Sequence, residues 1–159
     1  MNNYIYIGGE KYIKAGCEEC KKEKSPYEFE KYDKIYWLSA DGFVVTRKTG
    51  YIDKFESELK QGNIFRTKEK AIHERDKRKA IFKIKKYIYD NFGYDPTDWV
   101  DGDDKYILMW HDNGWKKKFE IESFYNWKPC SPIGYLKTED QAQEIIDNFE
   151  DELKIIFDI

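Results

Sequence analysis

Histidine, cysteine and proline are scarce in this sequence of 159 residues, which holds two His, three Cys and four Pro. It contains no H-E-x-x-H motif, no glycine-rich phosphate loop, and no Ser or Cys in a nucleophile motif. Three cysteines are too few and too unevenly spaced for a disulfide framework, which favours a reducing compartment such as the cytoplasm. The sequence therefore predicts a protein that is not an enzyme, has no catalytic residues and needs no cofactor.

Long apolar runs are also missing from the chain. No N-terminal segment resembles a signal peptide, and no segment approaches the length that a transmembrane helix needs. These absences predict a cytoplasmic protein without a membrane partner.

The segment Cys17-Glu18-Glu19-Cys20 has the spacing of half a zinc site. A closed tetrahedral site needs two further ligands, and the candidates are Cys130, His73 and His111. None of them is paired at a useful spacing, so we expect no metal.

Aromatic residues, in contrast, are abundant. They make up 18% of the chain, with 13 Tyr, 10 Phe and 5 Trp, while the net charge is only −3. Tyr and Trp bury a large area and keep a polar edge, which suits half-exposed sheets and binding surfaces. This composition argues against a disordered chain, and the small net charge does not indicate any class of partner.

One eight-residue sequence pattern, the repeated phrase, occurs twice. Residues 64–71, Ile-Phe-Arg-Thr-Lys-Glu-Lys-Ala, return at residues 135–142 as Tyr-Leu-Lys-Thr-Glu-Asp-Gln-Ala. The pattern is typical of a strand that runs directly into a helix, with Thr67 and Thr138 as N-caps and an acidic residue in the first turn. It predicts two β-rich units, each closed by a helix.

Strong hairpin signals complete this plan. Asp41-Gly42 separates two apolar segments, and a turn at 111–114 joins strands at 105–110 and 115–122, with Trp115, Phe119 and Ile121 on one face. A helix is expected from Thr67 to Phe92, and an amphipathic one follows Thr138. We predict an α+β fold of two β-hairpin-plus-helix units packed together, with antiparallel sheets and helices on one face. The expected divisions are residues 1–33 (a variable hairpin and Cys loop), 34–93 and 94–159.

Several spaced blocks between Ile35 and Phe157 also suggest a family. They are Asp41-Gly42, Asp53, Gly62–Ala71, Asp98-Trp99 with Asp104–Ile107, and Tyr135–Thr138 with Gln141-Ala142 and Ile145–Asp147. In these blocks the chain resembles a family of small phage and prophage proteins of low-GC Gram-positive bacteria. The resemblance implies a phage accessory protein that acts on host machinery or on competing nucleic-acid systems. The family has no assigned active site, so no catalytic residue is transferred, and residues 1–33 lie outside the pattern.

Charge is distributed unevenly along the chain. Residues 67–91 hold nine basic and four acidic residues, whereas residues 139–159 hold eight acidic residues and one Lys. On the expected helix 67–92, basic residues fall in one stripe opposite an apolar stripe that includes Ile84 and Ile88. Such a stripe suits a phosphate backbone, although it is also typical of any solvated surface helix. The candidate nucleic-acid-binding residues are Lys68, Arg75, Lys79, Lys83 and Lys86.

The loop 95–104 contains five Asp and no basic residue. It lacks the ligand spacing and the closing Glu of an EF-hand, so it is either a solvated linker or an acidic face that engages a basic groove. The candidate partner-binding residues are Asp95, Asp98, Asp101, Asp103 and Asp104.

These observations lead to two functional hypotheses. The first is a non-enzymatic phage-encoded inhibitor that binds a host antiviral defence protein or nucleoprotein effector, such as a CRISPR effector, through acidic surfaces. The alternative is a small DNA- or RNA-binding phage regulator that uses the basic helix 67–91.

Overall fold

The computed structural model describes residues 4–7, 10–13, 33–48, 56–98, 102–125 and 130–159. The chain divides into two compact units, residues 1–71 and 72–159. Most of the long helix therefore belongs to the second unit, whereas the expected division at residues 93 and 94 assigned all of it to the first. The predicted Cys17–Cys20 loop lies outside the described residues.

The N-terminal hairpin consists of β1 (Tyr4–Ile7) and β2 (Glu10–Ile13). The two strands are antiparallel, with Tyr4 opposite Ile13 and Ile7 opposite Glu10. This pairing is the hairpin that was expected within residues 1–33.

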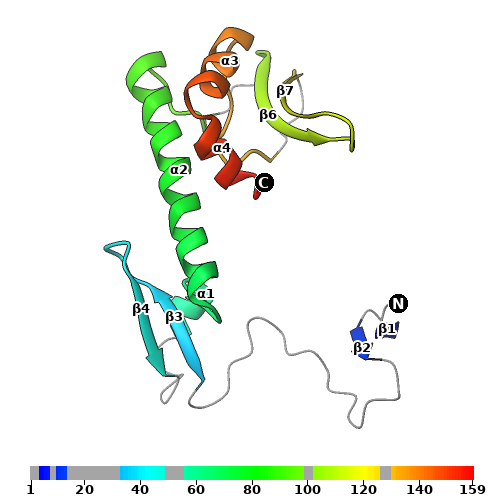
Figure 1. Cartoon of the computed structure of the whole chain (residues 1–159). Helices are drawn as coiled ribbons and strands as arrows, with labels where there is room; N and C mark the ends of the chain where they lie inside the picture. Colours follow the sequence, from blue (N-terminus) through cyan, green and yellow to red (C-terminus); the bar gives the residue numbers. More distant parts are fainter. Residues whose placement is uncertain (1–3, 8–9, 14–32, 49–55, 99–101, 126–129) are drawn as a thin grey trace. The chain divides into compact units, whose positions relative to one another are not determined.

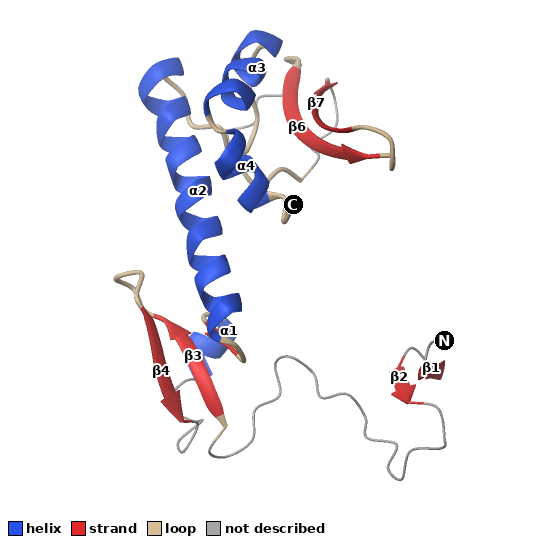
Figure 2. Ribbon diagram, in the orientation of Figure 1, coloured by secondary structure: helices blue, strands red, loops and turns tan. Residues whose placement is uncertain are grey.

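The first unit contains a three-stranded antiparallel sheet in the order β4-β3-β5. Figure 2 shows its strands β3 and β4 side by side. The strands are β3 (Lys34–Leu38), β4 (Val44–Lys48) and β5 (Ile64–Phe65), and a short helix, α1 (Glu56–Lys60), precedes β5. The turn between β3 and β4 has Gly42 at φ +79°, a conformation that glycine adopts without strain. The buried side chains of this sheet are Ile35, Leu38 and Ile64.

The helix α2 (Lys68–Phe92) begins within the first copy of the repeated phrase, directly after Thr67. The Oγ1 of Thr67 accepts a hydrogen bond of 3.2 Å from the backbone N–H of Lys70, as the N-cap prediction requires. The helix ends at Gly93, which adopts φ +75°. Both predicted boundaries of this helix are confirmed.

The second unit opens with a hairpin of β6 (Lys105–Asp112) and β7 (Lys117–Phe124). Leu108 lies opposite Ile121, and Trp110 lies opposite Phe119. The face with Leu108, Phe119 and Ile121 packs on the core. The predicted position of Trp115 is wrong, because this residue precedes β7 and lies in the turn.

The second copy of the repeated phrase meets this hairpin as the first copy meets β3. Leu136 forms an isolated antiparallel bridge with Tyr106, and the two residues exchange N–H···O bonds of 2.9 Å. The segment before Thr138 therefore forms a single β-bridge instead of the full strand that the repeat predicted. Thr138 has an extended backbone, and its side chain accepts a bond of 3.2 Å from the N–H of Gln141, so the second N-cap is also confirmed.

Two helices follow Thr138 where one was expected: α3 (Glu139–Asn148) and α4 (Glu150–Ile156). The break lies at Phe149, whose φ of −133° leaves the helical region while its ring stays buried. In Figure 1, α3 and α4 lie between α2 and the β6–β7 hairpin. The core of this unit is built from α2, the hairpin and both closing helices; its fully buried large side chains are Ile84, Ile88, Ile133, Leu136, Ile145 and Leu153.

The loop that follows α2 is held against the second junction. The N–H of Tyr135 donates a bond of 2.7 Å to the carbonyl oxygen of Pro96. Gly134 adopts φ +91°, and a Cβ at this position would lie 2.2 Å from that same oxygen. Only glycine therefore permits this close approach of two backbone segments.

These elements confirm the predicted α+β class. In the described ranges, no helix combines the length and the apolar character that crossing a bilayer requires.

We expect Thr138→Ala to lower the free energy of unfolding by roughly 0.5–2 kcal/mol, because the N–H of Gln141 loses its acceptor. Thr138→Ser keeps the hydroxyl and is the matched control. Denaturant unfolding of both variants measures the difference, and equal losses for Ala and Ser would contradict the N-cap role.

Gly134→Ala should cost more than about 2 kcal/mol, because it adds a backbone clash to an unfavourable positive φ. Gly114 has a similar φ of +80° but no atom within 4 Å of the added Cβ. Gly114→Ala should therefore cost only about 1–2 kcal/mol, the penalty for the left-handed conformation alone. Similar losses in the two variants would show that the contact with Pro96 is not tight.

Candidate interaction surfaces

The predicted acidic surface is only partly available for a partner. Oδ1 of Asp95 accepts bonds from the N–H (2.8 Å) and the hydroxyl (2.6 Å) of Thr97, and these bonds lower the pKa of Asp95. Asp103 lies 3.5 Å from the ammonium of Lys105. Asp98 and Asp104 are exposed, and Asp101 lies outside the described residues. The described part of this loop thus engages Asp95 and Asp103 in contacts of its own, while the side chains of its four described Asp residues are all exposed.

The predicted basic stripe on α2 is interrupted by carboxylates. Arg75 pairs with Asp76 at 2.8 Å, Lys86 pairs with Asp90 at 2.5 Å, and Lys83 pairs with Glu152 of α4. Lys79 is exposed, and Lys68 lies in the first turn of the helix, within the first unit. Three of the five candidate cations therefore have an acidic neighbour, which weakens the field that a phosphate backbone would meet.

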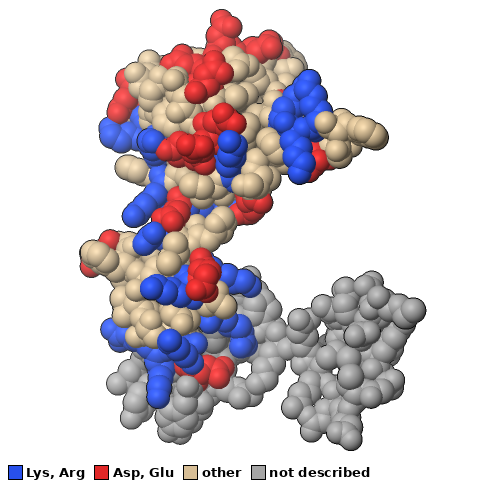
Figure 3. All heavy atoms as spheres, in the orientation of Figure 1, with Lys and Arg blue, Asp and Glu red and all other residues tan. Residues whose placement is uncertain are grey.

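The charge of the second unit is negative as a whole. Residues 72–159 include fourteen Lys and Arg and nineteen Asp and Glu, a net charge of −5. On the face drawn in Figure 3, acidic side chains gather over α3 and α4, and basic ones lie beside the tip of the β6–β7 hairpin. A polyanion would be repelled by most of this unit, whereas a basic protein surface would be attracted.

Trp115 at the tip of the β6–β7 hairpin is 98% exposed. Its backbone N–H and that of Lys116 donate to Oδ1 of Asn113, at 3.1 and 2.7 Å. The N–H of Gly114 donates to Oδ1 of Asp112 at 3.0 Å. The turn is therefore held by its own side chains, and it presents a large aromatic ring on a fixed backbone.

The sides of this tip are polar and balanced in charge. Lys117 pairs with Asp112 at 3.0 Å, and Lys118 pairs with Glu120 at 2.5 Å, which lowers the pKa of Glu120. Nε2 of His111 lies 3.4 Å from the carboxylates of both Glu120 and Glu122. The basic residues beside Trp115 thus do not form an isolated cationic patch.

Two further exposed aromatic residues escaped the sequence-based prediction. Phe82 and Tyr89 are 67% and 64% exposed and lie two helical turns apart on α2, on the side opposite the buried Ile84 and Ile88. The sequence did contain a signal for them. Both rings fall on the basic side of the helix, which does not pack on the core, so a large apolar residue there is unusual.

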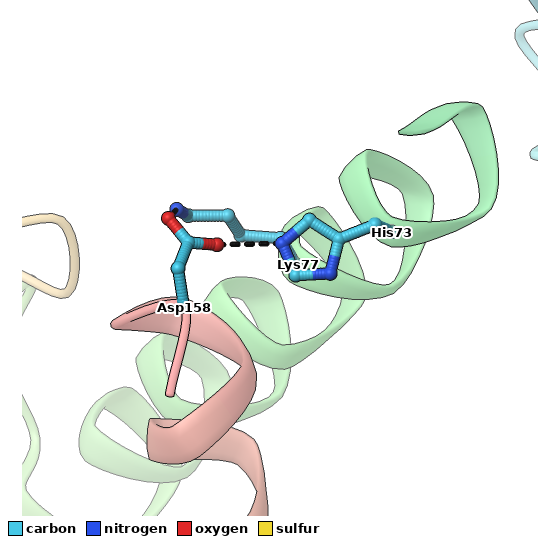
Figure 4. A network of polar contacts seen from close by, with 3 residues as sticks. All are labelled: His73, Lys77 and Asp158. Atoms are coloured by element: carbon cyan, nitrogen blue, oxygen red, sulfur yellow. Dashed lines mark hydrogen bonds and ion pairs between the residues drawn. The ribbon is translucent and has the colours of Figure 1, made fainter. Parts of the chain in front are cut away.

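His73 belongs to a small polar cluster at the C-terminal end of the chain (Figure 4). Its Nε2 lies 2.5 Å from Oδ1 of Asp158, and the ammonium of Lys77 lies 2.8 Å from Oδ2. Hydrogen bonds from Lys77 and His73 lower the pKa of Asp158. Asp158 also adopts φ +59°, a conformation that Asp tolerates better than most residues. The side chains of His73 and Asp158 are about half exposed, so the cluster joins the chain end to α2 on an open surface.

The expected absence of a metal stays a prediction. Among the described residues, no three His, Cys, Asp or Glu side chains gather in a metal-binding group. Cys130 has an exposed thiol, whereas Cys17 and Cys20 lie outside the described ranges.

No protein-family model, no curated protein and no solved structure matches this chain. The resemblance to phage proteins accordingly remains a prediction from the sequence.

We expect Asp158→Asn to lower the free energy of unfolding by at most about 1 kcal/mol at pH 7, because the pairs are exposed and screened. The folded-state pKa of Asp158 is lower than its ordinary value of 3.8, so ionised Asp158 stabilises the fold above that value. This contribution is lost as the pH falls through the folded-state pKa. The difference between variant and wild type should therefore shrink in acid, and a constant difference from pH 7 to pH 3 would contradict the ionic role.

Proposed function

We propose that this protein is a non-enzymatic binding protein whose partner is another protein. The observation that supports the proposal most directly is Trp115, which is 98% exposed on a turn fixed by hydrogen bonds from three backbone N–H groups. Trp is enriched among the few residues that dominate the free energy of protein binding. Burying about 150–250 Å² of aromatic surface gains roughly 4–6 kcal/mol before the costs of association.

The fixed turn increases the binding affinity that this ring can provide. An anchor on a flexible loop must be ordered when the partner binds, and that ordering reduces the affinity. Asn113 accepts two backbone bonds and thereby holds the segment before the partner arrives. The polar side chains around the ring suit the rim of an interface, where water remains accessible.

The charge of the second unit favours a protein partner with a basic surface. A net charge of −5 over residues 72–159 would accelerate association with such a surface. Exposed Asp98 and Asp104 contribute to this field. Host antiviral defence proteins that hold nucleic acid in basic grooves fit this chemistry, and the phage-like sequence blocks favour the same class. The proposed function is inhibition of such a protein, of which a CRISPR effector is an example.

The alternative, a DNA- or RNA-binding regulator, fits the charges less well. Arg75, Lys83 and Lys86 each have a carboxylate partner, and the unit around them is net negative. We expect no binding of duplex DNA near physiological salt concentration.

The test is phage plating on a strain in which a CRISPR effector restricts the phage. Expression of the wild-type protein should restore plaques, and the purified protein should bind the effector directly. Trp115→Ala should weaken this binding by about thirtyfold or more, because a central anchor is worth at least about 2 kcal/mol.

Two further variants make this result specific. Asn113→Ala keeps the ring but loosens the turn, and should weaken binding less than Trp115→Ala does. Phe43→Ala removes another exposed aromatic residue, which is 68% exposed at the β3–β4 turn, and should leave binding unchanged. Failure of the wild-type protein to restore plaques or to bind any tested effector would reject the inhibitor proposal, and an equal loss in Phe43→Ala would reject the role of Trp115.

A further inference from the structure

A hollow of about 320 Å³ lies between α2 and the loop that follows it. Phe82, Lys85, Lys86 and Tyr89 line it from the helix, and residues 95–97 line it from the loop. Its volume is at the lower end of the range for ligand sites, and its two aromatic rings are largely exposed. Isolated exposed rings are common on protein surfaces, but these two rings line the same hollow and offer apolar surface at one place.

Both walls of the hollow are held by contacts elsewhere in the second unit. The helix wall is fixed because Ile84 and Ile88, on the opposite side of α2, are fully buried. The loop wall is fixed by the hydrogen bond from Tyr135 to Pro96 and by the absence of a Cβ at Gly134. The hollow is thus formed before any partner binds, which lowers the cost of binding.

Charged side chains of both signs lie at the edge of the hollow. Lys86 is paired with Asp90 at 2.5 Å. Hydrogen bonds from Thr97, with a smaller contribution from the charge of Lys85, keep the pKa of Asp95 below its ordinary value, so Asp95 is ionised at neutral pH. Lys86 therefore has one carboxylate partner, which reduces what a polyanion would gain here. A carboxylate of a partner can replace Asp90 at Lys86, because an exposed (i, i+4) pair is weak and exchanges readily.

We propose that this hollow is a docking site for a short segment of a protein partner that presents a large apolar side chain beside an acidic residue. The apolar side chain lies between the rings of Phe82 and Tyr89. The carboxylate bonds with Lys85 or Lys86, which both line the hollow from α2. This docking site is separate from Trp115 and does not rest on the inhibitor function.

The test begins with selection of peptides from a random twelve-residue display library on the immobilised full-length chain. We expect the selected peptides to share a large apolar residue next to Asp or Glu. One of them, synthesised with a fluorophore, then reports its dissociation constant by fluorescence anisotropy. The double variant Phe82→Ser/Tyr89→Ser should weaken binding by about tenfold or more, because it removes both apolar contacts.

Lys85→Ala/Lys86→Ala should weaken binding by about three- to tenfold and reduce its dependence on salt, because it removes the charged contacts. This second variant keeps the proposal testable if the aromatic double variant does not fold. Phe43→Ser is the matched control, since Phe43 is as exposed as Phe82 but lies in the first unit, and binding should not change. Trp115→Ala should also leave peptide binding unchanged, which separates this site from the proposed inhibitor function.

Other outcomes would overturn the proposal. Selected peptides without a common apolar and acidic pair, or an equal loss in Phe43→Ser, would show that the hollow is not the site. If fluorescein-labelled oligo(dT) binds the wild type and the aromatic double variant abolishes that binding, the occupant is a nucleic-acid strand. If the wild type self-associates in sedimentation and the same variant is monomeric, the occupant is a second copy of this chain.

Discussion

The burial of Ile84 and Ile88 is the constraint on which the second unit depends. Both side chains are fully buried, together with Ile145 of α3 and Leu153 of α4. Exposing one of them would cost roughly 1.5–3 kcal/mol, so this contact determines the rotation of α2 about its axis. Once that rotation is set, the helical period places Phe82, Tyr89 and the basic stripe on the opposite side, in solvent. The exposed aromatic surface is therefore a consequence of the core.

The repeated phrase shows which parts of the structure local sequence determines and which parts depend on distant contacts. Thr67 and Thr138 both cap helices, because a hydroxyl that follows an extended residue satisfies an N–H in the next turn. The strand before each Thr depends on its neighbours instead. Ile64 and Phe65 pair with β3 as a short strand, whereas Leu136 makes only a bridge to Tyr106. The caps could be predicted from local sequence, but the extent of pairing could not.

The candidate sites were harder to predict because they depend on contacts between distant residues. Lys83 belongs to the predicted stripe, but its partner, Glu152, lies 69 positions away in the chain. The apolar pattern placed Trp115 on one strand face with Phe119 and Ile121. In the structure, hydrogen bonds that begin at Asp112 form the turn, and the ring of Trp115 lies in solvent. The hollow beside α2 needs Gly134 against Pro96, a contact between segments that no local pattern connects. The break at Phe149 likewise follows from packing, because its ring contacts Tyr87 at a centroid distance of 4.9 Å.

The balance between charge and aromatic area decides which surface can provide affinity. The ion pairs around Lys86, Lys117 and Lys118 are exposed and screened by solvent, so each contributes little to affinity or stability. A fully exposed Trp, in contrast, can gain several kcal/mol when a partner covers it. The charges therefore control the rate and the choice of partner, while the aromatic rings control how tightly it is held. Because Trp115 stands on a turn and Phe82 and Tyr89 on a helix fixed by its core, neither surface has to be reorganised before a partner binds.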